Sequence, residues 1–123
     1  MRTLGAHLTA VEHGRVEIRL AATEGLKQQH GYLHAGVMAS VLDSACGYAA
    51  LTMAPEGANV VSIEFKINML SPALGEELIA RAHIKRSGKN VAVCAGDAYM
   101  VRAGETHEKL VATMLATMML QRG

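Results

Sequence analysis

The apolar stretch from Ala35 to Ala54 constrains the fold more than any other part of the chain. Nearly every position in it is apolar or small, which is typical of a helix buried on all sides. One carboxylate, Asp43, lies near its middle. An ionised side chain on a buried helix costs free energy unless another group pairs with it or uses it. The sequence therefore predicts a central helix that carries a functional carboxylate and ends before Pro55, Glu56 and Gly57.

The composition is that of a globular protein. Of 123 residues, 50% are hydrophobic and 19% are charged, with a formal net charge of +1. This length predicts a single domain over residues 1–123. Because the charge is balanced, we expect no nucleic-acid partner.

The chain is predicted to be cytoplasmic. The apolar stretch is long enough to span a membrane, but Asp43 at its centre would cost roughly 2.5–3.5 kcal/mol on insertion. No lysine or arginine flanks it, and the N-terminal residues lack the apolar core of a signal peptide. Cys46 and Cys94 are far apart without a CxxC motif, which favours a reducing compartment, and we expect Cys46 to pack against the sheet.

Alternating apolar and polar residues predict strands on both sides of the helix. Two short strands within residues 7–20 meet at a turn near Gly14, and four antiparallel strands follow the helix. Their expected ranges are Val61–Met69, Glu77–Lys85, Val91–Val101 and Lys109–Leu120.

Three details of these strands are also predicted. Strict alternation in 61–69 puts Ile63 on the apolar face and Ser62 on the polar face. Gly96 is expected to mark a bulge or a close backbone approach. The run 109–120 is apolar on both faces, which is typical of a strand covered on both sides.

The segment from Gln28 to Asp43 resembles the hotdog-fold acyl-CoA thioesterases, and most closely their PaaI-like (phenylacetate-degradation) branch. It has a glycine at Gly31, the tripeptide His34-Ala35-Gly36, and Asp43 nine residues after the histidine. The resemblance implies an α+β hotdog fold, in which a curved antiparallel sheet of five to six strands wraps one long central helix. It also implies an acyl-CoA substrate and no separate cofactor.

The resemblance assigns roles residue by residue. Asp43 matches the catalytic carboxylate, which acts as general base or as nucleophile. The backbone N–H groups of Ala35 and Gly36 match the groups that hold the thioester carbonyl oxygen. Gln28 and Ala35 stand where the family usually has Asn and Gly. His34 matches the motif histidine, and Ser62 falls where some members place an assisting hydroxyl.

The proposed chemistry agrees with elementary electrostatics. A helix start offers unpaired N–H groups and a positive dipole end, which suit a developing oxyanion. The leaving thiolate resembles a cysteine side chain, with a reference pKa of about 8.5, so it departs without strong acid assistance.

Distance along the helix predicts an oligomer. Ala35 and Asp43 are eight residues apart, which is roughly 12 Å at 1.5 Å per residue. Both cannot contact one carbonyl group within the same chain. We therefore expect a homodimer in which the helix start of one subunit meets Asp43 of the other, and dimers of this family often pair into tetramers.

Other roles for the same residues remain open. Asp43 could be a paired structural carboxylate, His34 a capping residue and Ser62 an ordinary strand residue. His30 and His34 have the spacing of a helical metal pair, but without a third ligand we expect no metal. The hairpin turn near Arg86, Ser87, Gly88 and Lys89 could bind the phosphates of coenzyme A or simply be solvated.

Three functions are compatible with the sequence. The leading hypothesis is an acyl-CoA thioesterase that produces free acid and coenzyme A. The alternatives are a hotdog-fold hydratase or dehydratase acting on acyl thioesters, and a non-catalytic acyl-CoA-binding module.

Overall fold

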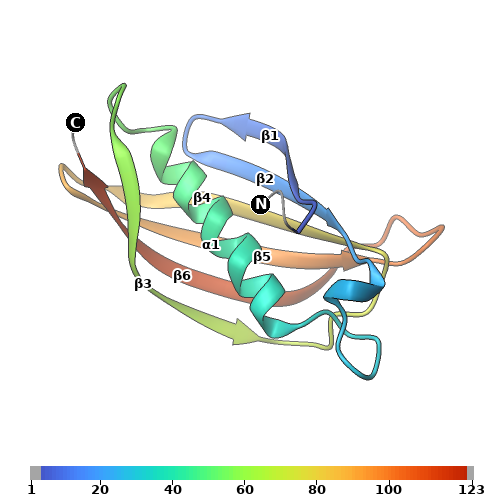
Figure 1. The fold of residues 1–123 in the computed structure, drawn as a ribbon. Helices are drawn as coiled ribbons and strands as arrows, with labels where there is room; N and C mark the ends of the chain where they lie inside the picture. The colour runs from blue at the N-terminus through green and yellow to red at the C-terminus, as the bar shows by residue number, and fades with distance from the viewer. Residues whose placement is uncertain (1–3, 122–123) are drawn as a thin grey trace.

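A curved six-stranded antiparallel sheet wraps one long helix in the computed structural model, which describes residues 4–121 (Figure 1). The elements in chain order are β1 (His7–Glu12), β2 (Arg15–Ala21), the short 3₁₀ helix η1 (Glu24–Leu26), α1 (Ala35–Leu51), β3 (Asn59–Met69), β4 (Glu77–Ser87), β5 (Val91–Val101) and β6 (Lys109–Gln121). The strand order is β1-β2-β4-β5-β6-β3, so β1 and β3 form the two edges. This confirms the predicted hotdog fold with five to six strands.

The predicted strands form close to their expected bounds. β5 occupies the predicted range, and β3, β4 and β6 extend one or two residues further. Each is antiparallel to its neighbours. Local alternation is strong in these segments, which explains why their positions were predictable.

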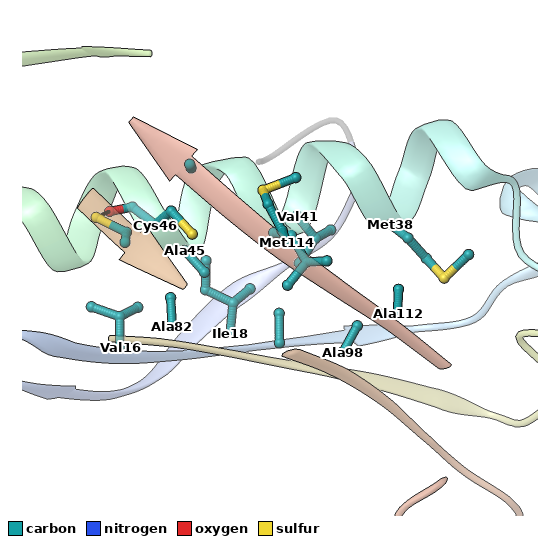
Figure 2. Packing of buried hydrophobic residues seen from close by; sticks show 14 of the residues in the cluster. Val16, Ile18, Met38, Val41, Ala45, Cys46, Ala82, Ala98, Ala112 and Met114 are labelled. Carbon is teal, nitrogen blue, oxygen red and sulfur yellow. Dashed lines mark hydrogen bonds between the residues drawn. The ribbon is translucent and has the colours of Figure 1, made fainter. Parts of the chain in front are cut away.

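One face of α1 packs on the sheet and forms the core. Val41, Leu42 and Ala45 are fully buried, and Met114 and Ala112 of β6 lie against this face (Figure 2). A Cβ added to Gly96 would lie 3.1 Å from Leu42 Cδ2. The glycine therefore permits a close approach of β5 to the helix, as predicted.

The opposite face of α1 is exposed to solvent in the single subunit. Gly36, Ser40, Tyr48 and Leu51 are solvent-accessible, so the prediction of a helix buried on all sides is wrong for the monomer. The sheet curves around only one side of the helix. Apolar and small residues on the other face produced the misleading sequence pattern, because such residues also occur on exposed surfaces.

The helix ends before Pro55, as predicted, although the apolar stretch continues to Ala54. α1 ends at Leu51, ahead of the turn at Pro55. The Thr52 hydroxyl donates to the Ala49 carbonyl at 2.7 Å and accepts the N–H of Gly14 at 2.8 Å. The end of the helix is thus joined to the hairpin turn between β1 and β2.

A β-bulge in β3 reverses the predicted facing of Ser62. The pairing shifts between Ser62 and Glu64, so that Ser62 lies opposite Met118 and Phe65 lies opposite Ala116. Directly opposed residues share a face, and Met118 and Ala116 are both fully buried. Ser62 and Phe65 therefore both face the helix side, and the expectation from strict alternation is wrong.

β6 is not covered on both sides in the chain. Its inward residues Met114 and Met118 are buried, but Leu115 and Met119 on the outer face are 49% and 37% exposed. The prediction of a doubly covered strand is wrong for the monomer.

Candidate active site

Two hollows lie near the two ends of β3, one at the start of α1 and one beside its middle. The helix-start pocket has a volume of about 500 Å³ and is lined by Gln28, Tyr32, Leu33, His34, Ala35, Gly36, Met38, Met69, Leu70, Ser71, Pro72 and Ala73. The Asp43 groove has a volume of about 340 Å³ and is lined by Asp43, Ser44, Gly47, Tyr48, Leu51, Ala58, Asn59, Val60 and Ser62. The two share no lining residue.

Backbone hydrogen bonds hold the loop that leads into α1 beside the helix-start pocket. The N–H of Leu33 donates to the Ala73 carbonyl and that of His34 to the Leu26 carbonyl, both at 3.1 Å. Gly31 has φ +82°, a conformation that favours glycine and closes the turn beside Gln28. The loop therefore enters the helix along a defined path.

The first turn of α1 presents backbone donors to this pocket. His34 is the residue that precedes the helix, and its carbonyl accepts the N–H of Val37 at 3.0 Å. The N–H groups of Ala35 and Gly36 come before this first bond, where a helix leaves its donors without internal partners. Both residues are exposed, so a bound oxygen atom could reach these donors.

Asp43 is half-buried and accepts one short hydrogen bond. The Ser62 hydroxyl donates to Asp43 Oδ1 at 2.7 Å, and the same hydroxyl lies 3.3 Å from the sulfur of Met118. The bulge in β3 is what turns Ser62 toward the helix. Asp43 thus lines an open groove with one oxygen held and is not the fully buried charge that the apolar helix pattern predicted.

The structure brings the predicted site residues together in two separate groups. Asp43 and Ser62 share the Asp43 groove, and Gln28, His34, Ala35 and Gly36 share the helix-start pocket. The roughly 12 Å along the helix between Ala35 and Asp43 separates the two groups.

The turn at Arg86, Ser87, Gly88 and Lys89 lies outside both hollows. The Leu120 N–H donates to the carbonyl of Asn90 in this turn at 2.8 Å, and Leu120 pairs with Val60, which lines the Asp43 groove. The turn therefore occupies the same end of the sheet as the Asp43 groove.

The two cysteines are buried thiols. Burial raises the pKa of Cys46 to about 12 and that of Cys94 to about 11. The Cys94 thiol donates to the Cys46 carbonyl at 3.5 Å. Both thiols stay protonated near neutral pH, so they are unsuited to act as nucleophiles. The expectation that Cys46 packs against the sheet is confirmed.

Residues 4–121 contain neither a metal-binding cluster nor a membrane-spanning helix. Among them, no cluster of three His, Cys, Asp or Glu side chains is placed to hold a metal ion. In the same residues, no helix is both long and apolar enough to cross a membrane.

Tyr48 lines the Asp43 groove and is 39% exposed, and it was not predicted as a site residue. The available signal was a large aromatic side chain five residues after Asp43, preceded on the same helix face by the small residues Ser44 and Gly47.

A sheet-wrapped helix with a carboxylate half-way along it places the chain in the hotdog-fold class. The chain belongs to the thioesterase superfamily, whose sequence pattern matches residues 30–106. This confirms the family resemblance seen at Gln28–Asp43.

Individual proteins agree with this assignment. Mouse acyl-coenzyme A thioesterase 13 is 38% identical over 77 residues, which is 58% of this chain and 54% of the mouse protein. The chain thus matches little more than half the length of that relative. A thioesterase family protein from Silicibacter pomeroyi has a similar structure, with a TM-score of 0.96 and 46% identity over 100% of this chain and 89% of its own.

The PaaI protein from the Escherichia coli phenylacetic acid degradation operon shares the fold. Its TM-score is 0.85 and its identity 22%, over 99% of this chain and 83% of that protein.

Proposed function

We propose that this chain is a homo-oligomeric acyl-CoA thioesterase that hydrolyses an acyl-CoA thioester to free acid and coenzyme A. The observation that carries the proposal is the Asp43 carboxylate, which lines a groove with Oδ1 held by Ser62 at 2.7 Å. Membership of the thioesterase superfamily supports the same reaction.

A dimer built on the edge of β3 would complete the site. An edge strand presents unpaired N–H and C=O groups that a strand of another chain can pair. The Asp43 groove lies where β3 begins, at 58–62, and the helix-start pocket lies where β3 ends, at 69–73. Antiparallel pairing of two β3 strands about a two-fold axis puts the groove of one subunit beside the pocket of the other.

In such a dimer, each residue of the site has a defined role in hydrolysis. Asp43 Oδ2, which is not used by Ser62, takes a proton from water as the water oxygen attacks the thioester carbonyl carbon. The N–H groups of Ala35 and Gly36 of the partner subunit hold the developing oxyanion. The C–S bond breaks, coenzyme A leaves as a thiolate, and the proton passes to it.

Other polar groups would position the substrate. The Gln28 amide and the His34 ring line the helix-start pocket and would orient the thioester or the water. Arg86, Ser87, Gly88 and Lys89, at the end of the sheet shared with the Asp43 groove, would meet the phosphates of coenzyme A.

Asp43→Asn tests the base. We expect kcat to fall by at least about 10²-fold, because asparagine keeps an acceptor for Ser62 but cannot take a proton. Thiol release from a panel of acyl-CoAs, followed with a thiol-reactive dye, measures it. Asp97→Asn is a matched control, because Asp97 accepts a hydroxyl bond from Thr113 at 2.7 Å elsewhere in the sheet. Full activity in Asp43→Asn would contradict the assignment.

A mixing experiment tests the shared site. Ala35→Pro removes one N–H donor, and proline is tolerated at the first position of a helix. We expect Ala35→Pro and Asp43→Asn each to be inactive. Co-refolded together, they should recover about a quarter of wild-type activity, because half of the dimers are mixed and each mixed dimer has one intact site. No recovery would place the site within one chain.

Isotope labelling distinguishes the two roles of Asp43. In a single turnover in ¹⁸O-water, a general base puts the label in the product acid. Label in the Asp43 carboxylate would show a nucleophile, because it enters there only when water attacks the aspartate carbon of an acyl-enzyme.

A further inference from the structure

Edge strand β1 carries a bulge that turns two apolar side chains toward the helix. The pairing of β1 with β2 shifts between Leu8 and Ala10, with Leu8 opposite Ile18 and Val11 opposite Val16. Ile18 and Val16 are core residues, 1% and 4% exposed. Opposed residues share a face, so Leu8 and Val11 both lie on the helix side although they are three positions apart.

The extra residue of the bulge is Thr9, which is held on the outer face. Its hydroxyl donates to Glu17 Oε2 at 2.6 Å. In a strand without the bulge, Val11 would point away from the helix. The bulge thus builds an apolar surface beside α1.

This surface forms an apolar groove, which we call the β1 groove. It has a volume of about 240 Å³ and is lined by Leu8, Val11, Tyr48, Leu51 and Thr52. A neighbouring hollow of about 170 Å³ is lined by Ala6, His7, Leu8, Ile18 and Tyr48. The two hollows share Leu8 and Tyr48 and are therefore adjacent.

The far end of the groove is fixed by the hairpin turn. The Gly14 N–H donates to the Thr52 hydroxyl at 2.8 Å, and Gly14 has φ +79°. A Cβ at Gly14 would lie 3.2 Å from the sulfur of Met53. The turn is held close to the helix end, so the groove is formed before a ligand arrives.

The β1 groove continues from the Asp43 groove. Tyr48 and Leu51 line both. Tyr48 is five residues after Asp43, which is roughly 7.5 Å along the helix. Between them the helix surface carries Ser44 and Gly47, and a Cβ on Gly47 would meet no described atom within 4 Å beyond its chain neighbours and the adjacent helix backbone. These small residues leave an open path from the carboxylate to the β1 groove.

We propose that the β1 groove binds the apolar acyl part of the thioester and that Tyr48, at the junction of the hollows, determines the preferred acyl group. This rests on the proposed function. Its occupant is an alkyl or aryl chain, because none of the five lining residues is charged and the groove opens onto the Asp43 groove. Burying one methylene is worth about 0.8 kcal/mol, a factor of about four in kcat/KM.

Val11→Lys and Ala10→Lys test this on adjacent positions. Both place a lysine on exposed edge strand β1, but Val11 faces the groove and Ala10 lies opposite Glu17 on the outer face. We measure kcat/KM for acetyl-, butyryl-, octanoyl- and decanoyl-CoA. The ratio of the decanoyl to the acetyl value should fall at least about tenfold in Val11→Lys, since several methylenes lose their apolar contacts. It should stay at the wild-type value in Ala10→Lys.

Tyr48→Ala provides a second variant with a different structural change. We expect its preferred chain length to shift by at least two methylenes. Equal profiles in wild type, Val11→Lys and Tyr48→Ala, with normal thermal unfolding, would overturn the groove assignment and leave the proposed reaction intact.

If the wild-type protein hydrolyses none of these acyl-CoAs, the proposed function is overturned. The groove is then tested by a separate binding measurement. Binding of dansyl-undecanoic acid is then followed by fluorescence. Weaker binding in Val11→Lys than in Ala10→Lys would support the groove as an apolar site, and equal binding would overturn it.

Discussion

The hydrogen bond from Ser62 to Asp43 is the contact on which the candidate site depends most. The family resemblance pointed to both residues, but alternation along 61–69 placed Ser62 on the wrong face. The bulge that corrects it depends on pairing with β6, more than fifty residues away in the sequence. Local periodicity carries no information about such a register shift, so this part of the site was not predictable.

Ser62→Ala tests the contact at residue scale. A hydrogen bond to a charged group contributes about 1.5–3 kcal/mol. We expect kcat to fall roughly tenfold, because Asp43 loses the contact that orients it. Steady-state kinetics with one acyl-CoA measure it. Thr117→Val, which removes a 2.7 Å hydroxyl bond to Glu64 on the outer face, should keep wild-type kcat. A similar loss in both variants would indicate a general effect on the sheet.

At the scale of elements, the sequence predicted some properties of helix α1 and not others. The start at Ala35 and the apolar content were evident in the sequence, and a soluble core helix was expected. Which face is covered depends on how far the sheet curves, and that curvature arises from contacts between distant strands. The exposed face with Gly36, Gly47 and Tyr48 therefore came only from the structure.

Thr52→Val tests the junction between the helix end and the β1–β2 hairpin. Valine has a similar volume but leaves the Gly14 N–H without its hydroxyl acceptor. We expect the free energy of unfolding to fall by about 1–2 kcal/mol. Urea unfolding measures it. Ser40→Ala, whose hydroxyl donates to the Gly36 carbonyl of the same helix, should change stability by less than about 0.5 kcal/mol. Equal stability of Thr52→Val and wild type would show that the junction contributes nothing.

At the scale of the whole molecule, a network of charged and polar side chains joins β1, β2, β4 and Glu108, the residue before β6. Arg81 donates to both Glu108 oxygens, at 2.6 and 2.8 Å, and to Glu17 at 2.9 Å. The Arg81 guanidinium lies 5.2 Å from the centre of the Tyr99 ring. These contacts connect strands that are distant in sequence.

The network makes stability depend on pH. The Thr9 hydroxyl, followed by Arg81 and Arg19, lowers the pKa of Glu17 from 4.5 to about 2. The unfolded chain binds this proton first as pH falls, so the contribution is complete above pH 4.5 and is lost as pH approaches 2. We expect a loss of about 1–2 kcal/mol, less than the full shift implies because the pairs are partly solvated.

Urea unfolding between pH 5 and 2 measures this loss. Glu17→Gln should remove that part of the pH dependence, and Thr9→Val should weaken it. An unchanged slope in Glu17→Gln would show that other carboxyl groups control acid stability.

The two edge bulges change how the strands respond to substitution. In a regular strand, tolerance of charged residues alternates with every position, so a complete substitution scan would show a period of two. Along β1 and β3 this period should change phase at Thr9 and at Ile63, because the extra residue moves each later side chain to the other face. Growth or binding counts from such a scan would therefore locate each bulge, as the position where the alternation of tolerant and intolerant residues reverses.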